Sequence, residues 1–273
     1  MKNMDRVILG SVLLIGLGFG LNAQACTTDG WQGGASNAIA DSPSAVARYS
    51  EFCAMQVDDQ TGAGHVQSNF ASDSRYIGRF YVLPKLNGSD AVDILVAYSD
   101  EDPAATELFS IAYDGTDFIF DASGAGGGSG SAVAANGWNL IEFEFNSDGQ
   151  FNYWVNEDWD SNGLSYGAMT GDFAAGTGTV EAVQLGAPNG FGNHTGTLNF
   201  DAYESHRTTP VGALVVADAN NNGSVNIFDM IAMQNEILDP VGSLAPGQPD
   251  CNKNGGVNVF DMICAQNIIL GGN

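Results

Sequence analysis

The chain has 273 residues, of which 44% are hydrophobic and 15% charged, so it can bury one or two ordinary cores and is neither collagen-like nor disordered throughout. Acidic residues number 32 against 8 Lys plus Arg, which gives a formal net charge of −24. This charge excludes the positive surface that binding to nucleic acid or an anionic membrane requires. The 36 glycines favour many tight turns, and we expect a mainly β chain.

Residues 1–25 have the pattern of a secretory signal peptide. Lys2 and Arg6 lie in its charged start, Val7 to Leu21 form its apolar stretch, and Ala-Gln-Ala at 23–25 fits a cleavage site. The alternative is a membrane anchor, but these fifteen residues, interrupted by glycines, fall short of the about 20 that a spanning helix needs. We expect a secreted, extracellular protein, free or associated with a cell surface, without a membrane anchor.

Residues 26–208 contain eight short β-rich runs, at 76–83, 92–98, 108–113, 117–120, 138–145, 150–155, 181–185 and 197–203. Within one of them, Ile141, Phe143 and Phe145 alternate with Glu142 and Glu144, which places the apolar side chains on one face of a strand. So many short runs predict an antiparallel jelly-roll β-sandwich.

Turn and loop sequences separate the runs. Asp-Gly at 114–115 and at 148–149 is typical of hairpin turns, and residues 122–135 are so rich in Gly, Ser and Ala that we expect a flexible loop. The order of segments 138–145, 148–156, 183–186 and 198–204 resembles the laminin-G-like, concanavalin-like jelly rolls of secreted proteins. That resemblance implies the fold and says little about activity.

Glu142 and Glu144 are the most obvious carboxylate pair, and same-face neighbours in a strand lie about 7 Å apart, a spacing that glycoside hydrolysis can use. The E-x-D-x-x-E pattern of laminarinase-like jelly rolls is missing, so we expect a solvated outer-face pair. His65, His194 and His206 have no metal-ligand spacing. We assign no catalytic residue and favour a non-enzyme over a glycoside hydrolase acting on O-glycosyl bonds.

The polar loop around residues 156–166 is a candidate glycan-binding site. Sugars stack on aromatic rings while carboxylates and amides bond their hydroxyl groups, which suits Trp159, Asp160 and Tyr166. The same loop could instead hold calcium, or form a hairpin with Trp159 folded onto the sheet.

The segment 218–238 returns at 250–270 with 14 of its 21 positions identical. Each copy has Asp, Asn, Asn, Gly and Asp at positions 1, 3, 5, 6 and 12, the oxygen-ligand spacing of a calcium loop that ends in Asp. Position 7 of each loop contributes a backbone carbonyl oxygen, and position 9 contributes through a bound water molecule. We therefore predict two calcium ions, with the ligands Asp218, Asn220, Asn222, Ser224, Asn226 and Asp229, and Asp250, Asn252, Asn254, Gly256, Asn258 and Asp261.

Helical spacing of apolar residues follows each loop and predicts two amphipathic helices that pack together through their stripes. The stripes are Val225, Phe228, Ile231 and Leu238, then Val257, Phe260, Ile263 and Leu270. We expect a small all-α domain at 215–273 behind a linker at 209–214.

The duplicated D-x-N-x-N-G-x-V-N-x-x-D loop resembles the type I dockerin family. The resemblance implies calcium-dependent folding and docking onto a cohesin domain of an extracellular polysaccharide-degrading assembly. The family's partner-facing positions 10, 11, 17 and 18 are here Ile227, Phe228, Gln234 and Asn235, then Val259, Phe260, Gln266 and Asn267. Their near-identity permits two orientations related by 180°. The apolar pairs replace the frequent hydroxyl residues, and the alternative is that Phe228 and Phe260 are core residues of a calcium-stiffened end.

Four cysteines in an exported chain allow three disulfide pairings or free thiols. We favour pairing within each region, Cys26 with Cys53 and Cys251 with Cys264.

The sequence favours a secreted, non-catalytic protein whose jelly roll binds a polysaccharide or surface glycan while its dockerin-like end attaches it to a cohesin-like partner. The alternative is a dockerin-bearing polysaccharide hydrolase or lyase, which would show a cluster of acidic side chains on the concave face of its sheet. A structural role in adhesion or surface display is the third hypothesis.

Overall fold

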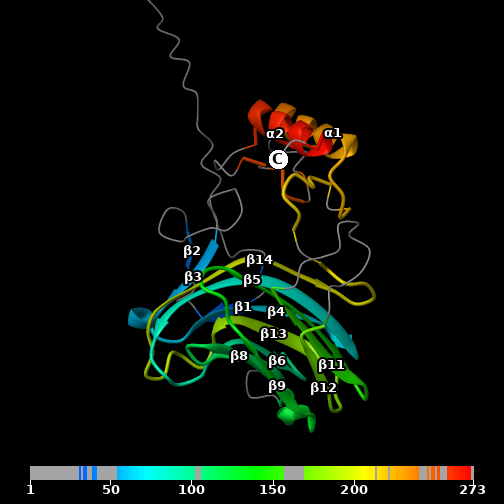
Figure 1. Cartoon of the computed structure of the whole chain (residues 1–273). Coiled ribbons are helices and arrows are strands. Elements are labelled where there is room, and N and C mark those ends of the chain that lie inside the picture. Colours follow the sequence, from blue (N-terminus) through cyan, green and yellow to red (C-terminus); the bar gives the residue numbers. More distant parts are fainter. Residues whose placement is uncertain are drawn as a thin grey trace, which may run out of the picture.

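The structure is a computed structural model that describes residues 31, 33–35, 39–41, 54–101, 106–156, 169–212, 214–220, 222–239, 245, 247–249, 251–252 and 257–271. These parts form a β-sandwich of two antiparallel sheets followed by two helices (Figure 1). Outside the described residues lie the signal segment and the candidate residues Cys26, Cys53, Trp159, Asp160, Tyr166, Asp250, Asn254 and Gly256.

Each sheet has seven strands. Sheet I runs in the order β1 (Gly33–Ala35), β4 (Gly64–Asp73), β13 (Val180–Ala187), β6 (Val92–Tyr98), β7 (Glu107–Tyr113), β8 (Asp117–Asp121) and β9 (Ser129–Val133). Sheet II runs in the order β12 (Gly171–Ala174), β11 (Gln150–Val155), β10 (Asn139–Asn146), β5 (Arg75–Asn87), β14 (Thr195–His206), β3 (Ala54–Asp58) and β2 (Ile39–Asp41).

All eight predicted β-rich runs fall on strands, with only Trp138 lying one residue before its strand, and the predicted mainly β fold is confirmed. The Asp-Gly turns join β7 to β8 and β10 to β11, where Asp148 and Gly115 have positive φ angles of 59° and 101°. The expectation of a flexible loop at 122–135 was wrong. The short 3-10 helix η2 (Ser123–Ala125) and strand β9 occupy it, because β9 completes the edge of sheet I beside β8.

Aromatic side chains fill the space between the sheets. Phe109 of sheet I lies with its ring centroid 5.5, 5.3 and 5.2 Å from those of Phe143, Phe145 and Phe151 of sheet II. All four side chains are fully buried, so the alternation read in the run 141–145 is confirmed. Burying a ring of this kind stabilises a fold by about 1.5–3 kcal/mol.

The opposite face of β10 differs from expectation. Glu142 is only 2% exposed, so the prediction of a solvated pair was wrong for it. Its carboxylate accepts hydrogen bonds from the backbone N–H groups of Val211 and Gly212, which cover it. Glu144 pairs with Arg75 at 2.6 Å.

The helices are α1 (Ile227–Leu238) and α2 (Val259–Ile269), and each begins with a capping box, Asn226 with Asp229 and Asn258 with Asp261. Their small shared core contains Met233 and Ala265, both fully buried. The predicted packing through the stripes was wrong for most of each stripe, because the helices meet through these residues instead. No helix in the described part of the chain is long and apolar enough to cross a bilayer.

Candidate functional site

The first predicted calcium loop is organised by two buried carboxylates. Asp229, fully buried at the start of α1, accepts hydrogen bonds from the backbone N–H groups of Asn220 at 3.1 Å and Asn226 at 2.7 Å. Asp218, 2% exposed, accepts from Asn222 and from Gly223. The two side chains therefore draw the backbone of the loop around one point.

Gly223 occupies the tight turn of this loop. Its φ of 82° lies in the left-handed region, and its N–H lies 2.6 Å from Asp218. A residue with a Cβ would be strained in this conformation, which explains glycine at position 6 of the repeat.

The loop has the electrostatics of a cation site. Burial raises the pKa of Asp218, and the neighbouring Asp229 carboxylate adds to the rise, while the Asn222 and Gly223 amides oppose it. Asn220 Oδ1 is buried without a hydrogen-bond partner among the described residues. A hard cation bound by oxygen atoms would compensate both carboxylates and satisfy this orphaned acceptor, so the residues fit calcium.

Only two acidic side chains belong to each predicted ligand set. No group of three or more His, Cys, Asp or Glu residues that could hold a metal occurs in the part of the chain that the structure describes. The loop compensates with amide and backbone oxygens, which calcium accepts readily.

The second loop repeats the arrangement where it is described. Asp261 is fully buried and accepts from the backbone N–H groups of Asn252 at 3.0 Å and Asn258 at 2.9 Å, as Asp229 does in the first loop. A disulfide joins Cys251 of the loop to Cys264 of α2, with 5.8 Å between the Cα atoms. It ties the loop covalently to its helix.

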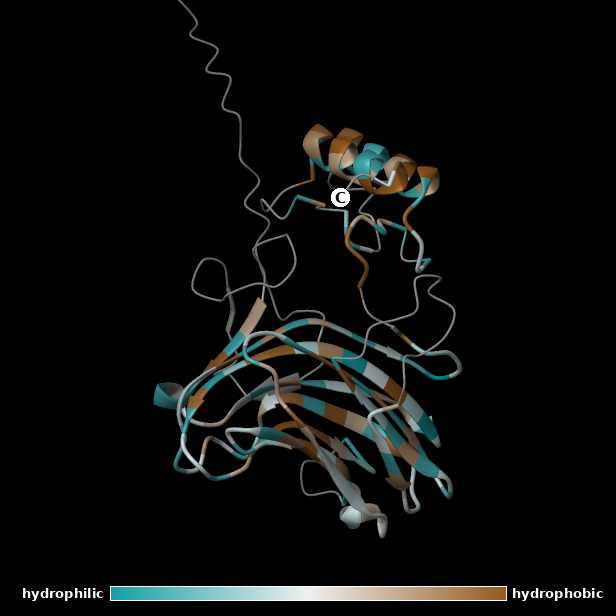
Figure 2. Cartoon of the chain, in the orientation of Figure 1, coloured by the Kyte–Doolittle hydropathy of each residue, from teal (hydrophilic) through white to brown (hydrophobic). Residues whose placement is uncertain are grey.

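The helices expose an apolar surface, visible as hydrophobic colour on their outer sides (Figure 2). Phe228 is 65% exposed and Phe260 66%, so the alternative that they are core residues was wrong. The polar members of the predicted partner-facing set, at positions 17 and 18 of each repeat, are also exposed. The structure thus brings all eight predicted residues to the surface, namely Ile227, Phe228, Gln234, Asn235, Val259, Phe260, Gln266 and Asn267.

This surface, here called the docking face, has two further properties. Equivalent residues of the two repeats have almost the same exposed fraction. It is 57% for both residues at position 10, 47% and 48% for Ile231 and Ile263, and 74% for both Leu238 and Leu270. The helices are uncharged on the outside, because their only charged residues, Asp229, Glu236 and Asp261, are buried.

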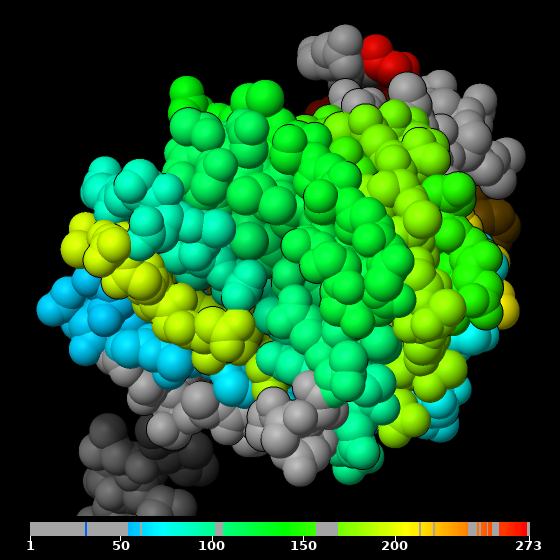
Figure 3. All heavy atoms as spheres, turned by 90° about the horizontal axis from the view of Figure 1, so that it is seen from below, coloured from blue at the N-terminus to red at the C-terminus, as the bar shows by residue number. Residues whose placement is uncertain are grey.

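A second candidate site lies on the outer face of sheet I, which points away from the helices and is the side seen in Figure 3. Gln184 donates a hydrogen bond to Gln67 at 2.9 Å, and both are nearly buried. Next to them in the sheet, Tyr98 on β6 lies opposite Glu107 on β7. This polar group of side chains is here called the sheet I face.

Carboxylates gather around Glu107. Burial raises the pKa of Glu107, and the charges of Asp93 and Asp121 raise it further, while a hydrogen bond from Ser110 opposes the shift. Sequence reasoning missed these residues. They lie on three successive strands at outward positions, so alternation within the predicted runs combined with a β6–β7–β8 meander could have found them.

Comparisons with known proteins bear mainly on the C-terminal region. Residues 216–270 match the family model described as the dockerin type I domain. No curated protein matches the chain at a significant level.

Among solved structures, the chain is similar to "Cellulose induced protein, Cip1", at 15% identity and a TM-score of 0.45 over 70% of this chain and 91% of that one. It is also similar to a sialidase, at 12% identity and a TM-score of 0.39 over 69% of this chain and 17% of that one. A Trypanosoma rangeli sialidase in complex with the inhibitor DANA aligns at 10% identity and a TM-score of 0.37, over 57% of this chain and 25% of that one. Similarities of this strength decide nothing about function.

Proposed function

We propose that this chain, in which a dockerin type I domain follows a β-sandwich, is a secreted protein that docks its sandwich onto a larger extracellular assembly. The dockerin domain binds two calcium ions, one in each loop, and its docking face binds a cohesin-like domain. The sandwich binds a polysaccharide or surface glycan, so the whole chain serves an assembly that degrades polysaccharide or lies at a cell surface.

The observation that carries the proposal is the docking face. Large apolar side chains such as Phe228 and Phe260 are 65% and 66% exposed, although hydrophobic surface of this kind is costly in water. A protein partner that covers it recovers that free energy. Because equivalent residues are exposed almost equally, a partner meets nearly the same surface after a rotation of 180°.

Neither helix exposes a charged side chain on the docking face. In a chain with a formal net charge of −24, the docking face is a neutral patch, so binding depends on apolar burial and little on charge pairs. We therefore expect the affinity for a cohesin domain to change little between low and high salt.

Binding to a panel of purified cohesin domains, in calcium and in excess chelator, tests this role. The mature chain should bind at least one member in calcium and none in chelator. Asp229→Asn together with Asp261→Asn should reproduce the chelator result, while Asp239→Asn, the same change just beyond α1, should bind as the wild type does. Calcium-independent binding, or no binding to any cohesin, would refute the proposed docking role.

For the glycan, the sheet I face places two amide side chains beside an aromatic ring, Gln67 and Gln184 next to Tyr98, all three nearly buried and the two amides bonded to each other. Amides and carboxylates that converge beside an aromatic side chain are the groups that bind sugar hydroxyls. Affinity electrophoresis through gels that contain soluble polysaccharides should show retardation that Gln184→Ala reduces. Lys85→Ala, at an exposed position of β5 in sheet II, is the control and should migrate as the wild type does.

A second function, polysaccharide cleavage, is favoured by one observation, the cluster of Asp93, Glu107 and Asp121 on the sheet I face. A carboxyl group whose pKa is raised by burial can hold a proton for a leaving group, while a neighbouring carboxylate stays ionised as a base. The size distribution of polysaccharides after incubation with the mature chain decides between an enzyme and a binding protein. Shortening that Glu107→Gln abolishes would establish an enzyme, and unchanged chains across the panel would leave a binding protein.

A further inference from the structure

The segment that joins the sandwich to the helices is bonded along its length to sheet II. Arg75 donates to the carbonyl of Thr208 at 2.9 Å, and Nδ1 of His206 lies 3.2 Å from the carbonyl oxygens of Thr209 and Pro210. Backbone groups of Val211, Gly212 and Leu214 are bonded to side chains of the sheet as well. Residues 208–212 and Leu214 therefore belong to a bound segment, here called the strap, on the outer face of the sheet.

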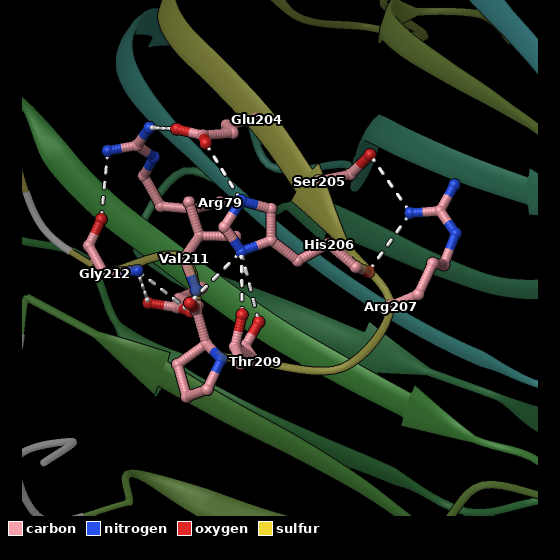
Figure 4. Close-up of polar contacts among 10 residues, drawn as sticks. Arg79, Glu204, Ser205, His206, Arg207, Thr209, Val211 and Gly212 are labelled. Carbon is pink, nitrogen blue, oxygen red and sulfur yellow. Dashed lines mark hydrogen bonds and ion pairs between the residues drawn. The ribbon is translucent and has the colours of Figure 1, made fainter. Parts of the chain in front are cut away.

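Two buried side chains hold the middle of the strap. Glu142 accepts from the N–H of Val211 at 2.8 Å and from the N–H of Gly212 at 3.1 and 3.2 Å. Arg79 donates to the carbonyl of Gly212 at 2.9 Å and pairs with Glu204 at 2.7 Å (Figure 4). Both polar groups of Gly212 are thus bound by charged side chains.

Strand register explains why these side chains meet. Arg79 on β5 is the direct partner of Glu142 on β10 and of Glu204 on β14. The three side chains therefore form one row across the centre of sheet II. Tyr81, two residues further along β5 on the same face, accepts a hydrogen bond from the N–H of Leu214 at 2.9 Å.

The strap is bonded to the three buried side chains Arg79, Glu142 and Tyr81. Arg79 and Glu142 are each 2% exposed and Tyr81 1%, although they lie on the face of the sheet that points away from the core. Buried charges are tolerated only where they are paired and hydrogen-bonded, and here the backbone of the strap supplies bonds to both. The strap and these three side chains thus depend on each other. Gly212 fits this path because its φ of 86° lies in the left-handed region.

We propose that Glu142, Arg79 and Tyr81 together form an orienting clamp. It fixes the chain up to Leu214, which leaves one residue before the dockerin type I match begins at 216. The helices are thereby held on the side of sheet II, opposite the sheet I face (Figure 1). Resting on the proposed docking role, the clamp keeps a protein bound to the docking face away from the sheet I face, where the proposed polysaccharide would bind.

Two NMR measurements on the mature, calcium-loaded chain test the clamp without any partner. The amides of Val211, Gly212 and Leu214 should exchange on the order of 100-fold more slowly than in an unstructured peptide. Residual dipolar couplings of the strands and of α1 and α2 should fit one alignment tensor. Rapid exchange of all three amides, or two independent tensors in the wild type, would overturn the proposal.

Variants then assign the effect to the clamp. Glu142→Gln combined with Tyr81→Phe should free the three amides and require two tensors, while amide protection in β7 stays as it is in the wild type. Glu181→Gln combined with Tyr113→Phe makes the same chemical changes in sheet I and should alter neither readout. If the Glu142→Gln, Tyr81→Phe variant keeps both the slow amide exchange and a single alignment tensor, the assignment of the effect to these side chains is refuted. Cohesin binding is not measured, so a failed docking role would leave this result intact.

Discussion

Replacing the two exposed phenylalanines tests both the docking face and its pseudo-symmetry. Phe228 and Phe260 occupy equivalent places in the two repeats and are 65% and 66% exposed. Their removal should leave the free dockerin domain as stable as before, within about 0.5 kcal/mol, because neither side chain belongs to its core. The effect should fall on binding to a cohesin domain.

The size of that effect follows from the exposed area. A Phe side chain presents roughly 200 Å², so about 130 Å² is exposed here and available to a partner. At about 25 cal/mol per Å², its burial contributes about 3 kcal/mol, or roughly 200-fold in affinity. If each of the two binding orientations buries one of the two rings, a single variant loses only one orientation. The remaining orientation still binds, so the affinity falls about two-fold, or about 0.4 kcal/mol.

We therefore expect Phe228→Ala and Phe260→Ala each to weaken cohesin binding about two-fold, and the double variant to weaken it roughly 200-fold. Isothermal titration calorimetry in calcium measures all three, and thermal unfolding checks the dockerin domain. A single variant that loses as much as the double variant would show one fixed orientation. A double variant that binds as the wild type does would remove the docking face from the interface altogether.

Further outcomes concern the individual parts of the chain. Excess chelator should unfold α1 and α2, seen as lost ellipticity at 222 nm, while the sandwich keeps its unfolding transition, because no ion pair within the described part of the chain neutralises the two Asp side chains of the first loop. Reduction of the Cys251–Cys264 disulfide, which closes a separation of 13 residues, should destabilise the dockerin domain by about 3 kcal/mol in chemical denaturation. Phe109→Ala should lower the free energy of unfolding of the sandwich by about 3–5 kcal/mol, because three rings lose their central contact. Glu107→Gln should stabilise the sandwich at pH 7 by less than ~1 kcal/mol, since half of the side chain is solvated. A carboxyl group with a raised pKa favours the fold only while it is protonated, so this gain should vanish in thermal scans below the ordinary pKa of Glu and grow as the pH rises through the raised value.

Much of the sandwich could be predicted because its signal is local. Runs such as 141–145 alternate strictly, and burial of the odd positions fixes which face is inside. The error at 122–135 has the same origin. Strand β9 consists of small residues whose pairing with β8 is decided by the neighbouring strand and by the edge of the sheet, neither of which composition can reveal.

The dockerin domain was predictable in its loops and less so in its packing. Ligand spacing at Asp218 and Asp229 is a property of consecutive residues, and the structure places both in one buried site. The apolar stripes were expected to be buried because periodicity shows that one side of a helix is hydrophobic and leaves open what covers it. In the structure small residues and Met233 form the contact between the helices, and Phe228 and Phe260 stay outside.

The two outer faces of the sandwich show why carboxylates alone could not reveal chemistry from the sequence. Glu142 stood out as half of a strand pair, yet both of its oxygens are taken by backbone N–H groups of the strap, so no substrate can reach it. Glu107 was not singled out in the sequence, yet its side chain is only partly buried in the structure, and burial raises its pKa. What separates the two is the segment that folds back after β14, which lies more than sixty residues from Glu142 in the chain. The choice between structural and chemical carboxylates is therefore made by long-range contacts, and it directs the search for substrate binding to the sheet I face.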